Sequence, residues 1–320
     1  MVAAKTTDDL ILDVIAAAQL QSDGAGTITD GRVSNDDVLT WASKLLSTSI
    51  ASMLLACSQE RWVWQDSDQT IVSGTAKYRI PSRALASGVA SLVILDGSSN
   101  EFHPPQISAA DRYRYASSRV GPWRSPFAMT WEGDHIVLLP TPAESGFSLR
   151  VRFPRQPPRL VAVSACAVVA STTSTVITTT ATVPTAWTAS ETLDLNEGTP
   201  HGDALGLDLA GTSISGTSIT IAAGVPSELA AGDYVSLAGH GCTLPVPEVV
   251  YHLLVDLVIV EVLRRIGSDP ADLQEARDAA AASMVHVRDI LEPRDRGASP
   301  KPIRRNSPLR AGRLPYGWGW

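Results

Sequence analysis

Apolar residues near the start of the chain recur with the period of an α-helix. They fall on one face of a helix that begins near residue 7, and its members are Leu10, Ile11, Val14, Ile15 and Ala18. Thr7 is expected to cap this helix at its N-terminus. Asp8 and Asp9 follow directly, where their negative charges suit the positive end of the helix macrodipole.

A second helix is predicted after a glycine-rich break at 22–31. It begins at Ser34, and Asp37 follows at the spacing of a capping box. Its apolar stripe comprises Val38, Trp41, Ala42, Leu45, Leu46, Ile50, Met53 and Leu54. Residues 1–60 are therefore expected to form a region of N-terminal helices.

After residue 61 the helical period gives way to short runs of apolar and β-branched residues. Gly, Pro, Asn, Asp or Ser bounds each run, which is typical of strands joined by turns. The runs cover residues 62–64, 70–72, 77–80, 90–95, 136–139 and 149–153. We expect a β-rich domain over residues 61–160.

Residues 161–243 differ in composition from the rest of the chain. They include no Lys or Arg, and nine of the twelve residues from 171 to 182 are Ser or Thr. Such tracts can be flexible linkers, but valine and isoleucine interrupt this one and threonine favours strands. We favour an inserted all-β subdomain over residues 161–245, with flexible loops as the alternative.

A strongly apolar helix is predicted after Pro247, whose fixed φ suits a first helical position. Residues 249–266 are apolar on nearly every side, yet the charged residues among them argue against a membrane span. Such a helix must be buried, either inside the fold or between subunits. The candidates for a contact between subunits are Leu253, Leu254, Leu257, Val258, Val260 and Leu263. With a last helix at 269–291, residues 246–292 would complete a bundle with the N-terminal helices.

Length and composition indicate a globular protein that needs no cross-links. The 320 residues are 44% hydrophobic and 18% charged, which is enough to bury a core. A net charge of −7 argues against a free-standing nucleic-acid binder. Cys57, Cys166 and Cys242 are far apart in the sequence, so neither a disulfide framework nor a zinc site is expected. The N-terminus has no signal-peptide pattern, which predicts a reduced protein made in the cytoplasm.

Basic residues concentrate at the C-terminal end. Residues 293–320 hold seven Lys or Arg and one Asp, a net charge of +6 that leaves −13 for residues 1–292. Proline and glycine interrupt this stretch, so it cannot form a core and is predicted to be an extended arm that orders on a partner. Its candidate binding residues are Arg294, Arg296, Lys301, Arg304, Arg305, Arg310, Arg313, Tyr316, Trp318 and Trp320.

Sequence patterns that would indicate catalysis are missing. The chain has neither a dinucleotide-binding glycine motif nor a Walker motif. His201 and Asp203 could ligate a metal, but a turn is the plainer interpretation. Cys57 is expected to be a small buried hydrophobe. His252 and Asp256 fall on one helix face and could form a proton pair, but a polar stripe at a subunit contact is the plainer interpretation. We therefore expect no enzyme activity, no cofactor and no metal site.

Several ordered segments resemble one family of virus proteins. They are residues 78–84, 137–142, 149–153, 155–161, 232–239, 244–248, 267–269 and 291–294. In this order the chain is similar to the head-to-tail adaptor proteins, also called connector or neck proteins, of tailed bacteriophages, especially short-tailed ones. The resemblance covers roughly residues 40–300 and leaves out the first 35 residues and the tryptophan-rich end.

The helices predicted at both ends of the chain and the β-rich middle together indicate an α+β fold. The resemblance implies a protein that forms a ring of subunits, commonly twelve, in the neck of the virion. Such a ring joins the portal protein of the capsid to a tail protein (nozzle or tail tube). It lets DNA pass without specific binding during ejection and helps to retain the packaged genome. The C-terminal arm would then bind the portal, with its cations pairing with portal carboxylates and its aromatic residues as buried anchors. No contact with a membrane is implied.

Two other functions were weighed against the adaptor. One is a different virion structural protein, such as a minor capsid, decoration or carbohydrate-binding tail protein. The other is a DNA-binding packaging factor that uses the basic arm, whose aromatic residues could stack on single strands. The net negative charge of residues 1–292 has two interpretations as well. It could belong to a channel wall that repels DNA phosphates, or it could simply be an acidic soluble surface.

Overall fold

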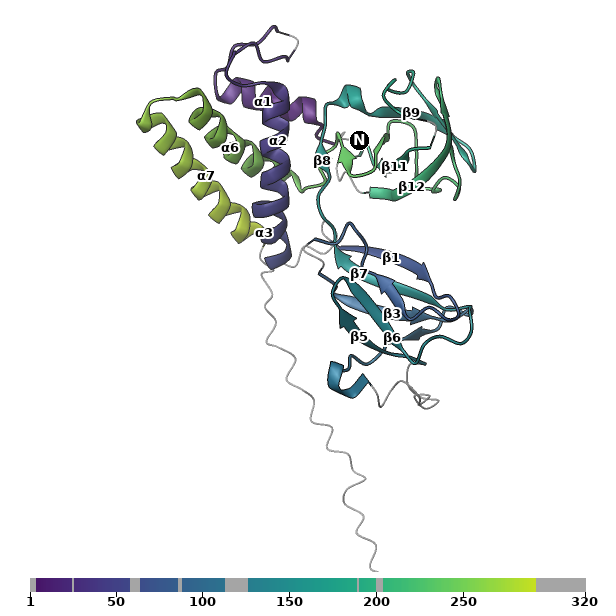
Figure 1. Cartoon of the computed structure of the whole chain (residues 1–320). Coiled ribbons are helices and arrows are strands. Elements are labelled where there is room, and N and C mark those ends of the chain that lie inside the picture. The colour runs from purple at the N-terminus through teal and green to yellow at the C-terminus, as the bar shows by residue number, and fades with distance from the viewer. Residues whose placement is uncertain are drawn as a thin grey trace, which may run out of the picture.

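The protein, seen here in a computed structural model, has an α+β fold, which confirms the predicted class. The structure describes residues 4–24, 26–57, 64–85, 88–112, 126–188, 190–199 and 204–291. These residues form a helical unit, a first β unit and a β-barrel, each with its own hydrophobic cluster. The barrel and the first β unit lie on the same side of the helical unit (Figure 1).

Segments from both ends of the chain build the helical unit. Its helices are α1 (Thr7–Ala17), α2 (Asn35–Leu45), α3 (Ala51–Ala56), α6 (Glu248–Ile266) and α7 (Pro270–Leu291). A π-helical turn, η1 (Leu46–Ile50), joins α2 to α3. Helix α6 contacts α7, α2 and α1, and its apolar side chains share one core with those of the N-terminal helices. This position explains why α6 is apolar on nearly every side.

The caps of the helices are close to the prediction, with one correction. Ser34 and Asp37 form the expected capping box at the start of α2. At the start of α1 the cap is Thr6 and not Thr7, because Thr6 exchanges hydrogen bonds with Asp9. Thr7 is instead fully buried and donates its hydroxyl to the backbone oxygen of Val161, 2.8 Å away.

The two ends of α6 compare differently with the sequence prediction. Its C-terminal end and the following loop agree with it, whereas Pro247, at its N-terminal end, is displaced by one position. Pro247 is the residue that precedes α6 and not its first helical residue. Gly267 ends α6 with φ +74°, a left-handed conformation that glycine adopts readily. Pro270 then opens α7, which runs to Leu291 as predicted.

The first β unit consists of two antiparallel sheets. One has the strand order β1-β7-β3-β4 and the other β2-β6-β5. The strands are β1 (Trp64–Thr70), β2 (Lys77–Arg79), β3 (Ser91–Leu95), β4 (Glu101–Phe102), β5 (Ala128–Glu132), β6 (His135–Leu139) and β7 (Ser148–Pro154). In β7, Leu149 and Val151 are buried, whereas Arg150 and Arg152 point outward and pair across the sheet with Asp68 and Asp66.

The first β unit corrects one predicted strand. The run at 70–72 is not a separate strand, because β1 ends at Thr70 and Ile71 continues into the core as a buried loop residue. Residues 62 and 63 of another predicted run lie outside the described residues.

The barrel is a closed sheet of antiparallel strands in the order β10-β13-β12-β11-β14-β9. They are β9 (Ala167–Thr172), β10 (Val176–Thr179), β11 (Thr192–Asn196), β12 (Ala204–Ser215), β13 (Ser218–Ile221) and β14 (Tyr234–Leu237). The Ser/Thr-rich tract therefore forms two adjacent strands, β9 and β10, and the flexible-loop alternative is wrong for it.

A short parallel pair of strands marks the place where the chain enters and leaves the barrel. Strand β8 (Arg159–Leu160) lies beside β15 (His240–Gly241), with Leu160 opposite Gly241. The 3-10 turn η4 (Val163–Ala165) leads from β8 into the barrel. The domain limits placed at residues 60, 160 and 245 stay predictions.

Candidate interaction surfaces

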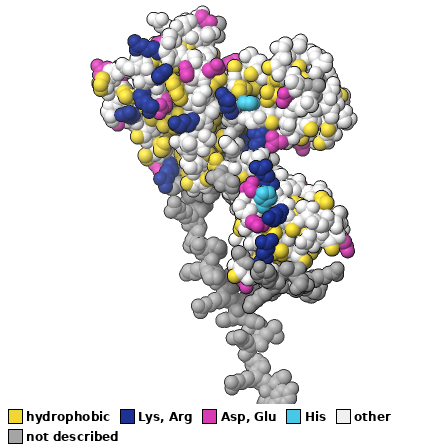
Figure 2. All heavy atoms as spheres, in the orientation of Figure 1, with side chains coloured by type: hydrophobic (Ala, Val, Ile, Leu, Met, Phe, Trp, Pro, Cys, Tyr) yellow, Lys and Arg dark blue, Asp and Glu magenta, His cyan; other side chains and the backbone are white. Residues whose placement is uncertain are grey.

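Helix α7 is the least covered helix of the described part of the chain. It lies on the side of the helical unit away from both β units (Figure 1), and only Ala280 and Val287 among its described residues are buried. Met284, Val285 and Ile290 are 38%, 61% and 45% exposed. Figure 2 shows apolar side chains at the surface of this unit, among basic ones. Exposed apolar side chains mark a contact with another protein when they gather in one patch. Met284 and Val285 are consecutive and both exposed, so their part of α7 is a candidate interaction surface.

The residues predicted to contact a neighbouring subunit divide into two groups. Leu253, Leu254 and Val258 are buried in the core of this chain. These three residues are therefore buried inside the fold and not between subunits. Leu257, Val260 and Leu263 keep part of their surface exposed. Only this second group offers exposed side-chain surface to a neighbouring subunit without rearrangement of the fold.

The predicted portal-binding arm lies outside the described residues, which end at Leu291. This applies to the seven cations between Arg294 and Arg313 and to the aromatic residues Tyr316, Trp318 and Trp320. Their role stays a prediction from the sequence.

A cluster of three charged side chains connects the first β unit to the barrel. Arg83, in the loop after β2, donates to both carboxylate oxygens of Asp194 at 2.8 and 3.1 Å. The same guanidinium reaches Asp208 at 2.8 Å through Nη2 and at 3.2 Å through Nε. Basic and acidic side chains are adjacent in this region in Figure 2. We call Arg83, Asp194 and Asp208 the junction cluster.

The backbone of the barrel is shaped around the junction cluster. Strand β12 carries a bulge between Gly206 and Leu209, and within it Asp208 adopts φ +53°. The backbone N–H groups of Asp208 and Gly239 both donate to the carboxylate of Asp194, at 2.9 and 2.8 Å. Gly239 has φ +84°, and a Cβ there would lie 2.8 Å from Nη1 of Arg83. A larger residue at 239 would therefore collide with the guanidinium.

Burial controls the electrostatics of the junction cluster. The side chain of Asp194 is 3% exposed, and this desolvation raises the pKa of its carboxyl group. For Arg83, burial alone would lower the pKa, but its pairs with Asp208 and Asp194 raise it overall. A carboxylate so well buried is stable only with its cation and its backbone donors in place. The junction cluster therefore fixes how the barrel and the first β unit meet.

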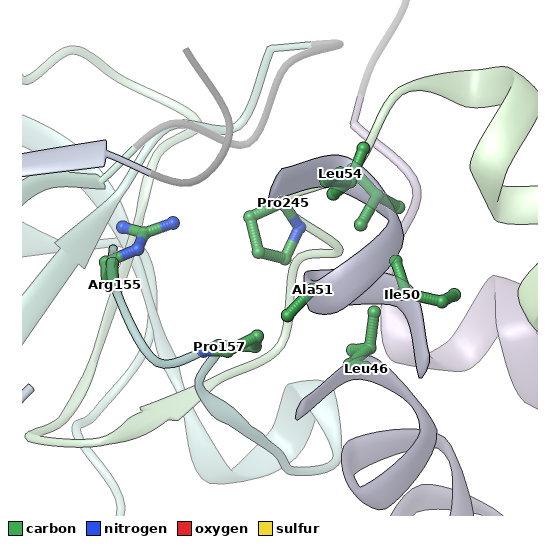
Figure 3. Close-up of a pocket in the computed structure, with 8 residues that line it drawn as sticks. Leu46, Ile50, Ala51, Leu54, Arg155, Pro157 and Pro245 are labelled. Carbon is green, nitrogen blue, oxygen red and sulfur yellow. The ribbon is translucent and has the colours of Figure 1, made fainter. Parts of the chain in front are cut away.

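A narrow apolar groove lies beside this junction. Figure 3 shows how it is lined by the η1–α3 segment and by the two linkers that lead into and out of the barrel. The lining residues are Leu46, Ile50, Ala51, Leu54, Arg155, Pro157, Pro245 and Val246. Its volume of about 20 Å³ leaves room for about one water molecule, too little for a small-molecule ligand.

Within the described ranges, no group of three or more His, Cys, Asp or Glu side chains could hold a metal ion. His201 and Asp203 lie outside those ranges. Asp256, expected on a polar stripe, accepts a hydrogen bond of 2.5 Å from Ser283 of α7. Cys57 is buried, which confirms its predicted environment. The expectations of no enzyme activity and no cofactor stay predictions.

The continuous helix from Asn35 to Ala56 is long and apolar enough to cross a membrane by length and composition alone. Its apolar stripe, including Val38, Ala42 and Leu46, is already part of the helical core. We therefore interpret it as a core helix.

Sequence reasoning missed the junction cluster. Arg83 is more than a hundred residues from both aspartates along the chain. No local spacing indicated this grouping, because it depends on how the barrel is closed and how it meets the first β unit.

Comparisons with protein-family models and with curated proteins found no match to this chain. The resemblance to phage adaptor proteins therefore stays a prediction.

Proposed function

We propose that this protein is a head-to-tail adaptor of a tailed, short-tailed bacteriophage. It forms a ring that joins the portal vertex of the capsid to the tail and lets DNA pass during ejection. The observation that carries the proposal is the position of α7, an outer helix with exposed apolar side chains that directly precedes the basic, aromatic arm. The order of the adaptor-like segments along the sequence supports it.

Contacts between subunits are assigned to the helical unit. In a closed ring each subunit uses two different faces, one for each neighbour. The exposed side of α7, with Met284 and Val285, supplies one of these faces. Leu257, Val260 and Leu263 of α6 also keep exposed surface that a second neighbour could bury.

Attachment to the portal is assigned to the arm at 293–320. Its net charge of +6 favours an acidic partner surface, and tryptophan and tyrosine are common anchors of binding energy. Ordering a single arm costs entropy, but a ring engages many arms at once, and this avidity offsets the cost. The net charge of −13 on residues 1–292 is compatible with a channel that does not hold DNA.

The experiment compares the full chain with a variant that lacks residues 293–320. Native mass spectrometry gives the number of subunits, and co-sedimentation with the portal protein of the same phage gives attachment. We expect rings for both proteins, and attachment for the full chain alone. A second variant, Trp318→Ala with Trp320→Ala, keeps all seven cations of the arm and should bind at least tenfold more weakly.

Three results would contradict the proposal. The first is a monomer even in the presence of the portal. The second is equal attachment by the truncated variant, which would remove the arm from the binding site. The third is a trimer that binds glycans, which would favour the alternative of another virion structural protein.

A further inference from the structure

A second groove lies in the first β unit, where β5 begins, β6 ends and β7 begins. Phe127 directly precedes β5, Pro140 directly follows β6, and Phe147 directly precedes β7. We call it the aromatic groove, and its lining residues are Pro126, Phe127, Pro140, Thr141, Ala143, Glu144 and Phe147. Its volume of about 280 Å³ lies close to the lower limit of about 300 Å³ for small-molecule sites, so it has room for a few side chains.

Aromatic rings form the wall of the aromatic groove. The ring centroids of Phe127 and Phe147 are 5.7 Å apart, and the two rings meet edge to face at 88°. Phe147 keeps part of its surface exposed, and Pro126 and Pro140 extend the apolar lining. Grooves lined by aromatic side chains are common docking sites for proline-rich segments, which bind there as a polyproline II helix. The lining therefore favours a proline-rich occupant.

Hydrogen bonds hold the loop between β6 and β7 in the shape that forms the aromatic groove. The N–H of Ile71 donates to the oxygen of Phe147 at 2.8 Å. The hydroxyl group of Ser73 donates to the oxygen of Ala143, also at 2.8 Å. Both donors belong to the segment that follows β1. A groove that is already formed loses little conformational entropy on binding, which favours affinity.

The lining of the aromatic groove carries one charge, the carboxylate of Glu144. This side chain is exposed, and it forms no ion pair with another described residue. A carboxylate at the rim of an apolar groove selects a partner that carries a cation. Thr141, also exposed, adds a hydroxyl group that can donate to a peptide carbonyl oxygen. The groove thus suits a segment that is both proline-rich and basic.

The arm at 293–320 contains a segment of this composition. Five of the seven prolines outside the described residues belong to the arm. Residues 299–305 have the sequence Ser-Pro-Lys-Pro-Ile-Arg-Arg, which combines two prolines and an isoleucine with three cations. Pro300 and Pro302 favour the polyproline II conformation before binding, which reduces the entropy lost on docking.

The arm is long enough to reach the aromatic groove of its own chain. Leu291, the last described residue, packs against the core that contains Leu54 of α3, and both α3 and α7 end at the lower side of the helical unit in Figure 1. Leu54 and Arg155, the residue after β7, line the same narrow groove. Pro302 is eleven residues beyond Leu291 and can lie up to about 36–40 Å from it, whereas a unit of this size is only about 30 Å across. A tether of this length gives an effective concentration in the millimolar range, so that even weak docking is populated.

We propose that residues 299–305 of the arm dock in the aromatic groove of the same chain. A polyproline II helix has three residues per turn, so Pro300 and Pro302 can lie against the apolar lining while Lys301 lies beside Glu144. The aromatic end of the arm stays outside the groove. This inference needs neither a portal nor a ring, so it does not rest on the proposed function.

Carbodiimide cross-linking of the full chain tests this contact, because the reagent joins a carboxylate to an amine that lies against it. Lys301 is the one lysine of the arm, and the rest of the chain has only Lys5, Lys44 and Lys77. We expect digestion and mass spectrometry to identify Glu144 as the main partner of Lys301. In an equal mixture of 15N-labelled and unlabelled chains, the link should join peptides of the same label.

Two pairs of substitutions in the arm serve as test and matched control. Pro300→Ala with Pro302→Ala keeps every charge but removes apolar surface, and should lower the yield of the link roughly fivefold. Pro308→Ala with Pro315→Ala changes two other prolines of the same arm and should leave the yield unchanged. Both double variants leave the described part of the chain untouched.

A synthetic peptide of residues 297–307 provides an independent measurement. Added at millimolar concentration to the chain that lacks residues 293–320, the peptide should also link to Glu144 through its lysine. If it forms no such link, the aromatic groove is not a site for this segment, and the proposal is wrong.

Three further results would overturn the proposal. If Lys301 links to the exposed Glu228 of the barrel as often as to Glu144, the arm has no docking site on the groove. Links between labelled and unlabelled chains would assign the groove to a second copy. A yield that is the same with and without Pro300 and Pro302 would leave charge attraction as the whole cause of the link.

Discussion

Replacing Arg83 with alanine would remove the cation that Asp194 and Asp208 share. Asp194, which is 3% exposed in the wild type, would then keep only the backbone N–H groups of Asp208 and Gly239 as donors. Removing one partner of a buried ion pair costs about 3–5 kcal/mol. Because two backbone donors remain and the Arg83 side chain is 19% exposed, we expect the lower end, about 3 kcal/mol.

Arg150→Ala is the matched control for this substitution. Arg150 also forms a bidentate ion pair with an aspartate: its Nε and Nη2 each donate to one carboxylate oxygen of Asp68 at 2.8 Å. Its side chain and that of Asp68 are 38% and 46% exposed, so solvent weakens the pair. Exposed pairs of this kind contribute about 0–1 kcal/mol. The two variants therefore remove the same kind of interaction from a buried and from an exposed site.

Hydrogen exchange measured by mass spectrometry can follow the two β units separately. A loss of about 3 kcal/mol should speed exchange in β11 and β12 by roughly 100-fold in Arg83→Ala. In Arg150→Ala, exchange in β1 and β7 should change by less than about fivefold. Equal effects of the two substitutions would refute the role given to burial at the junction cluster.

Two further predictions concern pH and assembly. Because burial raises the pKa of Asp194, the folded state keeps its proton to a higher pH than the unfolded state does. The free energy of unfolding of the wild type, relative to that of Asp194→Asn, should therefore fall as pH rises from about 4 through the raised pKa. Urea unfolding at a series of pH values measures this difference. A difference that stays constant with pH would contradict the prediction. Val285→Glu should change the free energy of unfolding by less than about 0.5 kcal/mol, since Val285 is 61% exposed, yet abolish rings in native mass spectrometry. Intact rings would remove α7 from the subunit contact.

Elements with a strong local period were predictable from the sequence. The stripes of α1 and α2 and the capping box of Ser34 and Asp37 follow from side-chain spacing, and the start of α7 at Pro270 follows from its proline. The cap of α1 was displaced by one residue although the local pattern held the answer. Asp9 follows Thr6, and not Thr7, at the capping-box spacing that identified Ser34 and Asp37. Thr7 is instead committed to its hydrogen bond with Val161.

The arrangement of the units and the junction cluster could not be predicted in the same way. Whether Leu253 and Leu254 lie inside the fold or between subunits depends on which helices cover α6, and an all-round apolar pattern is the same in both cases. Asp208 gives no sequence signal of its own, because its position follows from a bulge in β12 and a left-handed conformation. Long-range pairing of this kind is invisible to local spacing.

The side-by-side position of β8 and β15 makes the barrel a replaceable module. Leu160 and Gly241 are opposite one another in parallel strands, and the next residue, Val161, donates its N–H to the oxygen of Gly241. A linker of about two residues could therefore replace the chain between them. The helical unit and the first β unit would keep their own cores after such an excision. Recombination could thus exchange this domain for a different one, and the same graft site is open to protein engineering.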